Sequence, residues 1–171
     1  MERSARADAP RFPRLLLDAV ELAFHDFNRQ FKRPPLMTDN ALASQMAADA
    51  NSAVELAASH FDESLDYSEA SVAAIERMVD DVEYSLPGGA TPENKRLLCR
   101  LWGAYIGEVF RRNLGGQWLM WKDEYGEAIA LQCNEVTVFP HDKIRKRFSQ
   151  GIEHKLDAYY QVFRGQMKGE N

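Results

Sequence analysis

The stretch "LWGAYIGEVFRRNLGGQW", residues 101–118, holds the features that decide the fold. At helical spacing its large apolar side chains occupy one side, and Gly103 and Gly107 occupy a neighbouring side. Little of the circumference is polar, which predicts a central helix covered by its neighbours. Each interior glycine costs about 1 kcal/mol relative to alanine. We therefore expect the glycine face to let another backbone or a large aromatic ring approach closely.

The narrow polar strip of this helix contains Glu108, Arg111 and Arg112. Glutamate four residues before arginine is the favourable order for a helical ion pair, worth about 0.2 to 0.5 kcal/mol when exposed. A surface ion pair is the favoured interpretation, and a general acid or base at Glu108 is the alternative. "NLGG" does not indicate a phosphate-binding loop, because it follows a predicted helix and precedes a predicted strand.

The flanking segments predict the remaining elements. Apolar stripes at helical spacing predict helices over residues 14–33, from Thr38 or Asp39 to about His60, and from a cap at Ser68 to Leu86. Thr91, Pro92 and Glu93 mark the start of the central helix, and Gly115 marks its end. Alternating segments at 117–123, 127–133 and 136–139 predict strands, and residues 141–165 predict the last helix. The fold class is therefore α+β, with about four helices, a three-stranded antiparallel meander, and a C-terminal helix packed on the sheet.

The chain of 171 residues is long enough for one hydrophobic core. We expect a flexible arm at residues 1–13, a single domain at 14–165 and a flexible tail at 166–171. No apolar run approaches the roughly 18 residues of a membrane span, and the N-terminal segment lacks the apolar region of a secretory signal. Cys99 and Cys133 lack clustered spacing and favour small buried thiols. These features predict a cytoplasmic protein.

Three segments resemble, in order, the landmarks of a widespread group of bacterial proteins of unknown function. They are "LDYSEASVAAIERMVDDV", "LWGAYIGEVFRRNLGGQW" and "VFPHDKIRKRF". The shared features are an L-D-Y-S helix start, a G-x-Y-x-G-E-V helix ending in G-G-x-W, and an F-P before the last helix. The resemblance covers about residues 60–165. It implies a bacterial cytosolic protein with an α+β fold, and it brings no activity or catalytic residues with it.

Several functional classes are disfavoured. The four histidines do not pair with one another or with cysteine at metal-ligand spacing, so we expect no metal and no cofactor. No serine-hydrolase elbow is present, and we assign no catalytic residues. The formal net charge of -5 disfavours general nucleic-acid binding.

The charge is divided along the chain, with 16 acidic and 8 basic side chains in residues 1–90 and 10 acidic and 13 basic ones in residues 91–171. The candidate partner-binding residues form an acidic group, which consists of Asp62, Glu63, Asp66, Glu69, Glu76, Asp80 and Glu83. A solvated face, or pairing with the basic part of the chain, is the alternative. The acidic group motivates our main hypothesis, a non-catalytic immunity-type protein that neutralises a toxin or enzyme by covering its basic cleft.

The alternative hypothesis is an enzyme or small-ligand binder with a pocket between the sheet and the fourth helix, formed by Glu108, His141 and Arg145. On the last helix, Lys143, Lys146 and Arg147 lie opposite the apolar stripe and are expected to be solvated. Arg145 lies near that stripe, and we expect its stem to be buried and its guanidinium to pair with a carboxylate. A homodimer through the glycine face is a third hypothesis.

Overall fold

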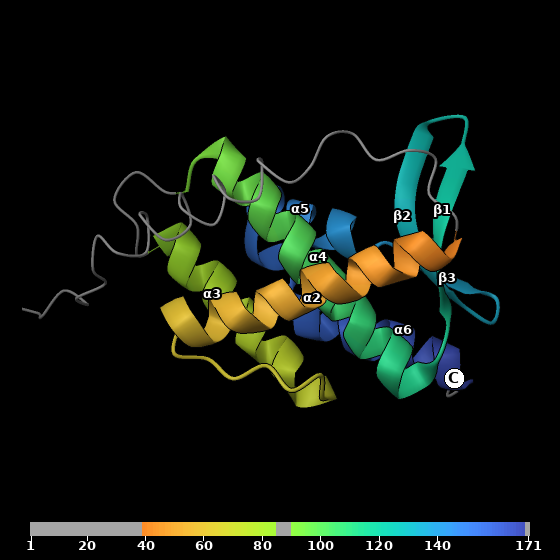
Figure 1. The fold of residues 1–171 in the computed structure, drawn as a ribbon, viewed down its shortest axis with the longest axis horizontal. Helices are drawn as coiled ribbons and strands as arrows, with labels where there is room; N and C mark the ends of the chain where they lie inside the picture. Colours follow the sequence, from red (N-terminus) through yellow and green to blue (C-terminus); the bar gives the residue numbers. More distant parts are fainter. Residues whose placement is uncertain (1–38, 85–89, 170–171) are drawn as a thin grey trace, which may run out of the picture.

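The computed structural model describes residues 39–84 and 90–169. Helix α2 spans Asp39–His60, the short 3-10 helix η1 spans Glu69–Ser71, α3 spans Val72–Tyr84 and α4 spans Pro92–Leu114. Strands β1 Gln117–Asp123, β2 Gly126–Cys133 and β3 Val136–Val138 follow. The chain then forms α5 Pro140–Gln150, the 3-10 helix η2 Gly151–His154 and α6 Leu156–Lys168 (Figure 1). The helix predicted over residues 14–33 lies outside the described residues.

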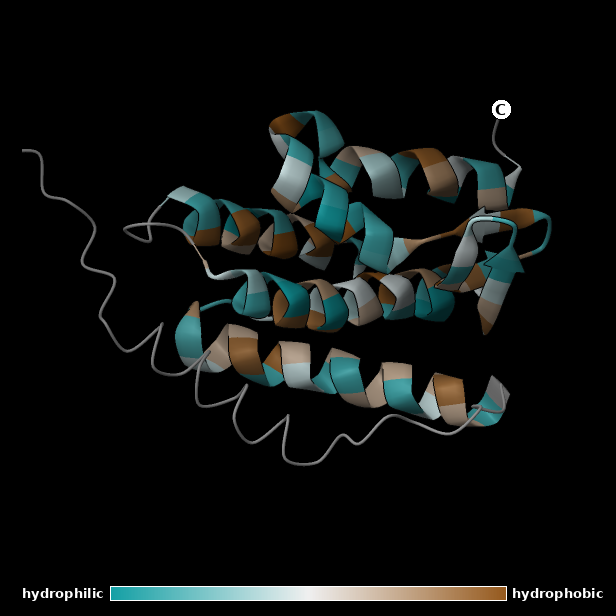
Figure 2. Ribbon diagram, turned by 90° about the horizontal axis from the view of Figure 1, so that it is seen from above, coloured by the Kyte–Doolittle hydropathy of each residue, from teal (hydrophilic) through white to brown (hydrophobic). Residues whose placement is uncertain are grey.

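Helix α4 is the central element, as predicted. Seen from above, it lies between α2 on one side and α3, α5 and α6 on the other (Figure 2). Every residue from 101 to 110 is buried, because neighbours cover the whole circumference. The expected end signals are present: the Thr91 side chain accepts a hydrogen bond from the Asn94 N–H at 3.2 Å, and Gly115 ends the helix at a φ of 85°.

The two glycines of α4 are used for close packing within the chain. A Cβ added at Gly107 would lie 2.0 Å from Cη2 of Trp118. A Cβ added at Gly103 would lie 2.7 Å from both Cα and Cδ2 of His141. The predicted close approach of an aromatic ring or a backbone is therefore confirmed, and both partners come from the chain itself.

The sheet is the expected antiparallel meander with strand order β1-β2-β3. In β1 and β2, Gln117 pairs with Gln132 and Asp123 with Gly126, which leaves a two-residue turn at residues 124–125. In the second hairpin Leu131 pairs with Val138. The observed sheet and the helices that flank it confirm the predicted α+β fold class.

The prediction of one continuous last helix over residues 141–165 is wrong. Gly151 has a φ of 79° and ends α5, and after η2 a new helix begins at Leu156. The Leu156 N–H, which starts this new helix, donates to Glu76 Oε2 in α3 at 2.8 Å. The helix also passes the predicted stop at Gly165 and ends at Gly169 in the left-handed conformation. The break lets the chain turn back, so that α6 packs against α3.

Candidate functional site

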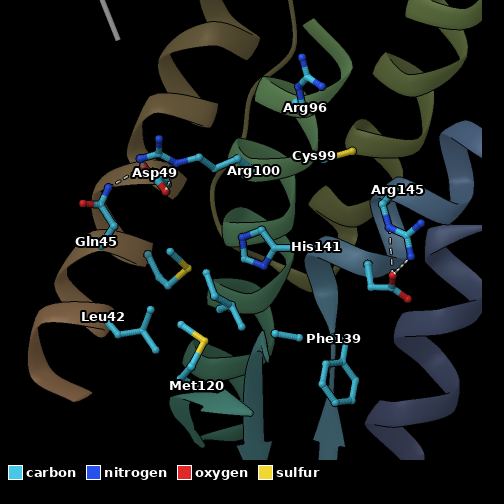
Figure 3. Close-up of a pocket in the computed structure, with 14 residues that line it drawn as sticks. Leu42, Gln45, Asp49, Arg96, Cys99, Arg100, Met120, Phe139, His141 and Arg145 are labelled. Carbon is cyan, nitrogen blue, oxygen red and sulfur yellow. Dashed lines mark hydrogen bonds and ion pairs between the residues drawn. The ribbon is translucent and has the colours of Figure 1, made fainter. Parts of the chain in front are cut away.

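A pocket of about 580 Å³ lies between α2, α4, α5 and the sheet. We call it the His141 pocket. It is lined by Leu42, Gln45, Met46, Asp49, Arg96, Cys99, Arg100, Met120, Ala128, Ile129, Phe139, His141, Asp142 and Arg145. Figure 3 shows Leu42, Met120 and Phe139 towards one end and Arg96 and Arg145 towards the other. A concave, mostly apolar site of this size with a few polar groups is typical of small-molecule binding.

The pocket is shaped by the packing of α5 on α4. Phe139 and Pro140 begin α5 directly after β3, with proline in the first turn where its missing N–H costs nothing. Gly103 has no side chain, and this lets the backbone and ring of His141 lie directly on α4. His141 therefore stands on the pocket wall, in the middle of the side chains shown in Figure 3.

A hydrogen-bonded ion pair forms one wall of the pocket. Asp49 of α2 is 3% exposed and accepts from Nε and Nη2 of Arg100 at 2.7 and 2.6 Å. Gln45 Nε2 also donates to Asp49 Oδ1 at 2.9 Å. A two-point arginine–carboxylate pair is geometrically specific and fixes both side chains. This wall joins α2 to α4 and keeps the polar side of the pocket in place.

His141 and Cys99 both have perturbed pKa values. Burial lowers the pKa of His141 to about 4, and the nearby Asp49 carboxylate offsets this only in part. The Arg100 backbone also favours the charged ring, but neither ring nitrogen makes a hydrogen bond of normal geometry within the described residues. Burial raises the pKa of Cys99 to about 11. At neutral pH the imidazole is therefore neutral and the thiol is protonated, and a protonated thiol is not the activated form of a cysteine nucleophile.

The mouth of the pocket carries charged pairs. Arg145 Nε donates to Asp142 Oδ1 at 3.1 Å, and Lys146 Nζ lies 2.8 Å from Asp142 Oδ2. Burial opposes ionisation of Asp142, but hydrogen bonds from Lys146 and Arg145 hold its pKa below the usual range. Arg96 pairs with Glu93 at 2.7 Å.

The structure brings together two of the three residues of the predicted alternative pocket. His141 and Arg145 both line the His141 pocket, and Arg145 pairs with a carboxylate as expected. Its stem is not buried, since its side chain is 65% exposed. Glu108 lies elsewhere, fully buried, where it accepts from Arg111, from Arg112 and from the Trp118 indole at 2.9 Å. It is therefore not the surface ion pair favoured by the sequence.

Arg147, expected on the solvated face of the last helix, is buried instead. Its side chain is 1% exposed and its Nε donates to Glu76 Oε1 at 2.7 Å. Its Nη2 donates to Asp80 Oδ1. The expectation was wrong because a helical projection of the last segment shows nothing of α3, which places two carboxylates against this face.

Most carboxylates of the acidic group have partners within the chain. Besides the two that bind Arg147, there are ion pairs from Glu63 to Arg77, from Glu69 to Arg164 and from Glu83 to Lys95. Asp66 accepts from the Ser68 N–H at 2.9 Å. Asp62 has a positive φ of 53° in the segment before η1. The basic part of the chain supplies much of the counter-charge, which was the alternative interpretation.

The sequence interpretation missed Gln45, Asp49 and Arg100 as pocket residues. One signal was present: Asp49 falls on the apolar stripe of α2, three residues after Met46. A carboxylate at such a position is rarely buried without a partner. The partner itself could not be found, because Arg100 is 51 residues away in the chain.

The similarity of this chain to known proteins includes part of the His141 pocket. A family model matches 77 of the 171 residues. It is described as a domain of unknown function, DUF3806, and it matches residues 84–160. The match supports an uncharacterised family and includes α4, the sheet and α5, whereas the α2 wall of the pocket lies outside it. No curated protein and no solved structure matches the chain.

Residues 39–84 and 90–169 lack two kinds of feature. No helix there is long and apolar enough to cross a membrane. No group of three or more histidine, cysteine, aspartate or glutamate side chains there is arranged to hold a metal ion. Cys99 and Cys133 are both free thiols.

Proposed function

We propose that this protein binds a small, mainly apolar molecule in the His141 pocket. The observation that carries the proposal is the pocket itself, about 580 Å³ with an apolar end and a hydrogen-bonded ion pair in its wall. This is the small-ligand form of the alternative hypothesis from the sequence, without Glu108. Binding is favoured over cysteine-based catalysis because burial raises the pKa of Cys99 to about 11, so the thiolate that such catalysis requires does not form at neutral pH.

Titration with N-phenyl-1-naphthylamine tests the proposal. This uncharged, apolar probe becomes fluorescent in an apolar environment. Full-length protein should bind it saturably at one site. Ala128→Phe places a ring at the exposed β2 position of the pocket lining, so we expect its affinity to fall at least about tenfold, or about 1.4 kcal/mol. Ala158→Phe changes another exposed alanine, which lies on α6 outside the pocket, and is the matched control. Absence of saturable binding, or equal effects of the two variants, overturns the proposal.

The chain also offers a rival occupant of the pocket. The apolar stripe predicted between Leu16 and Phe31 precedes α2, and the first turns of α2 carry the pocket residues Leu42 and Met46. Replacing Phe24 and Phe27 together by glutamate distinguishes the two occupants. Probe binding by the unchanged chain supports a ligand pocket, whereas binding that appears only in this double variant overturns the proposal in favour of an internal occupant.

An immunity-type function through the acidic group is the second candidate. Its specific support is that Asp80 and Glu69 keep 46% and 34% of their side chains exposed beside their arginine partners. A basic protein could therefore still meet negative charge there. Co-purification at low salt with the product of the adjacent gene tests this role, and failure of that product to bind would remove its support.

A further inference from the structure

The charge at the mouth of the His141 pocket is not balanced. Arg100 has its own carboxylate in Asp49, and Arg96 has its own in Glu93. Asp142, in contrast, is shared by Arg145 of the pocket lining and by Lys146, which lies outside the lining. Two cations on one carboxylate leave a surplus positive charge on α5 at this side of the pocket.

Arg145 also has hydrogen-bonding capacity to spare. Its Nε and Nη2 both donate to the same oxygen of Asp142, Oδ1. A guanidinium has five N–H donors in a planar fork, so one carboxylate oxygen does not use them all. The side chain is 65% exposed, which leaves the fork open to a second acceptor.

The positive field reaches into the pocket. Burial raises the pKa of the Cys99 thiol, and the charges of Arg145 and Lys95 act against this rise. Cys99 lines the same pocket, so a negative charge placed there would be stabilised by the same cations.

We infer that the ligand of the His141 pocket is an amphipathic anion, with its acidic group against Arg145 at the mouth and its apolar body towards Met120 and Phe139. This inference rests on the proposed function and specifies its ligand class. The anionic group can be a carboxylate, sulfonate or phosphate, since all present oxygens that a guanidinium fork recognises. The apolar body of the ligand would contact the apolar side chains of the lining.

Two probes with the same apolar body test the charge requirement. 8-Anilinonaphthalene-1-sulfonate is N-phenyl-1-naphthylamine with an added sulfonate. We expect full-length protein to bind the sulfonate more tightly than the uncharged probe at about 0.01 M salt, and the difference should shrink at about 0.5 M, because exposed charges are screened there. Arg145→Gln should weaken sulfonate binding about three- to fivefold, the upper part of the range expected for an exposed ion pair, and leave the uncharged probe unaffected.

Arg77→Gln is the matched control, because Arg77 is similarly exposed, is paired with a carboxylate, and lies outside the pocket lining. It should change neither affinity. Failure of both probes to bind overturns the proposed function itself. Saturable binding of the uncharged probe without tighter sulfonate binding, or equal effects of Arg145→Gln on both probes, overturns the anionic ligand alone. Thermal unfolding of each variant verifies that the fold is intact.

Discussion

Two arginine–carboxylate clusters of this molecule use the same chemistry in different surroundings. Between α3 and α5, Arg147 is 1% exposed and contacts Glu76 and Asp80, and the Leu156 N–H occupies a further Glu76 oxygen. Between α2 and α4, Arg100 and Asp49 form an equally close pair that borders a cavity of about 580 Å³. The first cluster encloses its guanidinium completely, with Asp80 alone half exposed, and joins three helices; we call it the closed cluster. The second is open on one side, and this is why we place ligand binding there.

The largest effect is expected from breaking the closed cluster. Arg147→Ala leaves Glu76 without its buried cation, and we expect a loss of about 3 kcal/mol in the free energy of unfolding, at the lower end for a broken buried pair because Asp80 is half exposed. Urea unfolding measures this. Arg145→Ala, on the same helix but in an exposed pair, should cost less than about 0.5 kcal/mol. Similar costs for the two variants would contradict the distinction between closed and exposed pairs.

The packing of α4 away from the pocket is tested at Gly107. Gly107→Ala forces Trp118 to move, because the new Cβ would lie 2.0 Å from its ring. At so short a contact we take the upper end of the usual cost of overpacking, about 3 kcal/mol; alanine regains about 1 kcal/mol of helix propensity, so we expect a net loss of about 2 kcal/mol. Thermal and urea unfolding measure it. Unchanged or increased stability would show that the indole has room to shift.

Titration of His141 in the pocket wall should make the free energy of unfolding depend on pH. His141 has a folded pKa of about 4 against an ordinary value of 6.5, so between these values the unfolded chain binds more protons and stability falls as pH falls. The full difference between these two pKa values corresponds to a loss of about 3 kcal/mol in the free energy of unfolding. We expect about half of that loss, because the ring borders an open cavity. Urea unfolding at pH 7.0 and 4.0 compares the unchanged chain with His141→Gln, which lacks this titration. Equal losses in both chains would contradict the assignment.

The open cluster is expected to contribute less to stability than the closed one. Asp49→Asn removes the charge from the pair with Arg100 but keeps the shape, and we expect a loss of about 1 kcal/mol, because the guanidinium can meet water in the cavity. Chemical unfolding measures it, alongside Arg147→Ala. A loss as large as that of Arg147→Ala would show that the cluster at Asp49 is as closed as the one at Arg147.

Local signals explain which parts of the fold could be predicted. Thr91, Pro92 and Gly115 act on backbone groups within a few residues of themselves, and the turn at residues 124–125 joins strands that are adjacent in the chain. The glycine face of α4 was predictable for the same reason, since interior glycines in a helix need a packing partner. The break at Gly151 was missed because the apolar stripe continues across it, while a partner from α3 stabilises the new helix start.

The sequence alone determined the order of elements, the buried central helix and the turns, because these depend on interactions between near neighbours. Only the tertiary structure decided that Arg147 is buried and Arg145 exposed, that Glu108 meets Trp118 away from the pocket, and that Asp49 meets Arg100. Each of these outcomes depends on which helix packs against a given face. That choice is made by contacts between residues far apart in the chain, which helical periodicity does not encode.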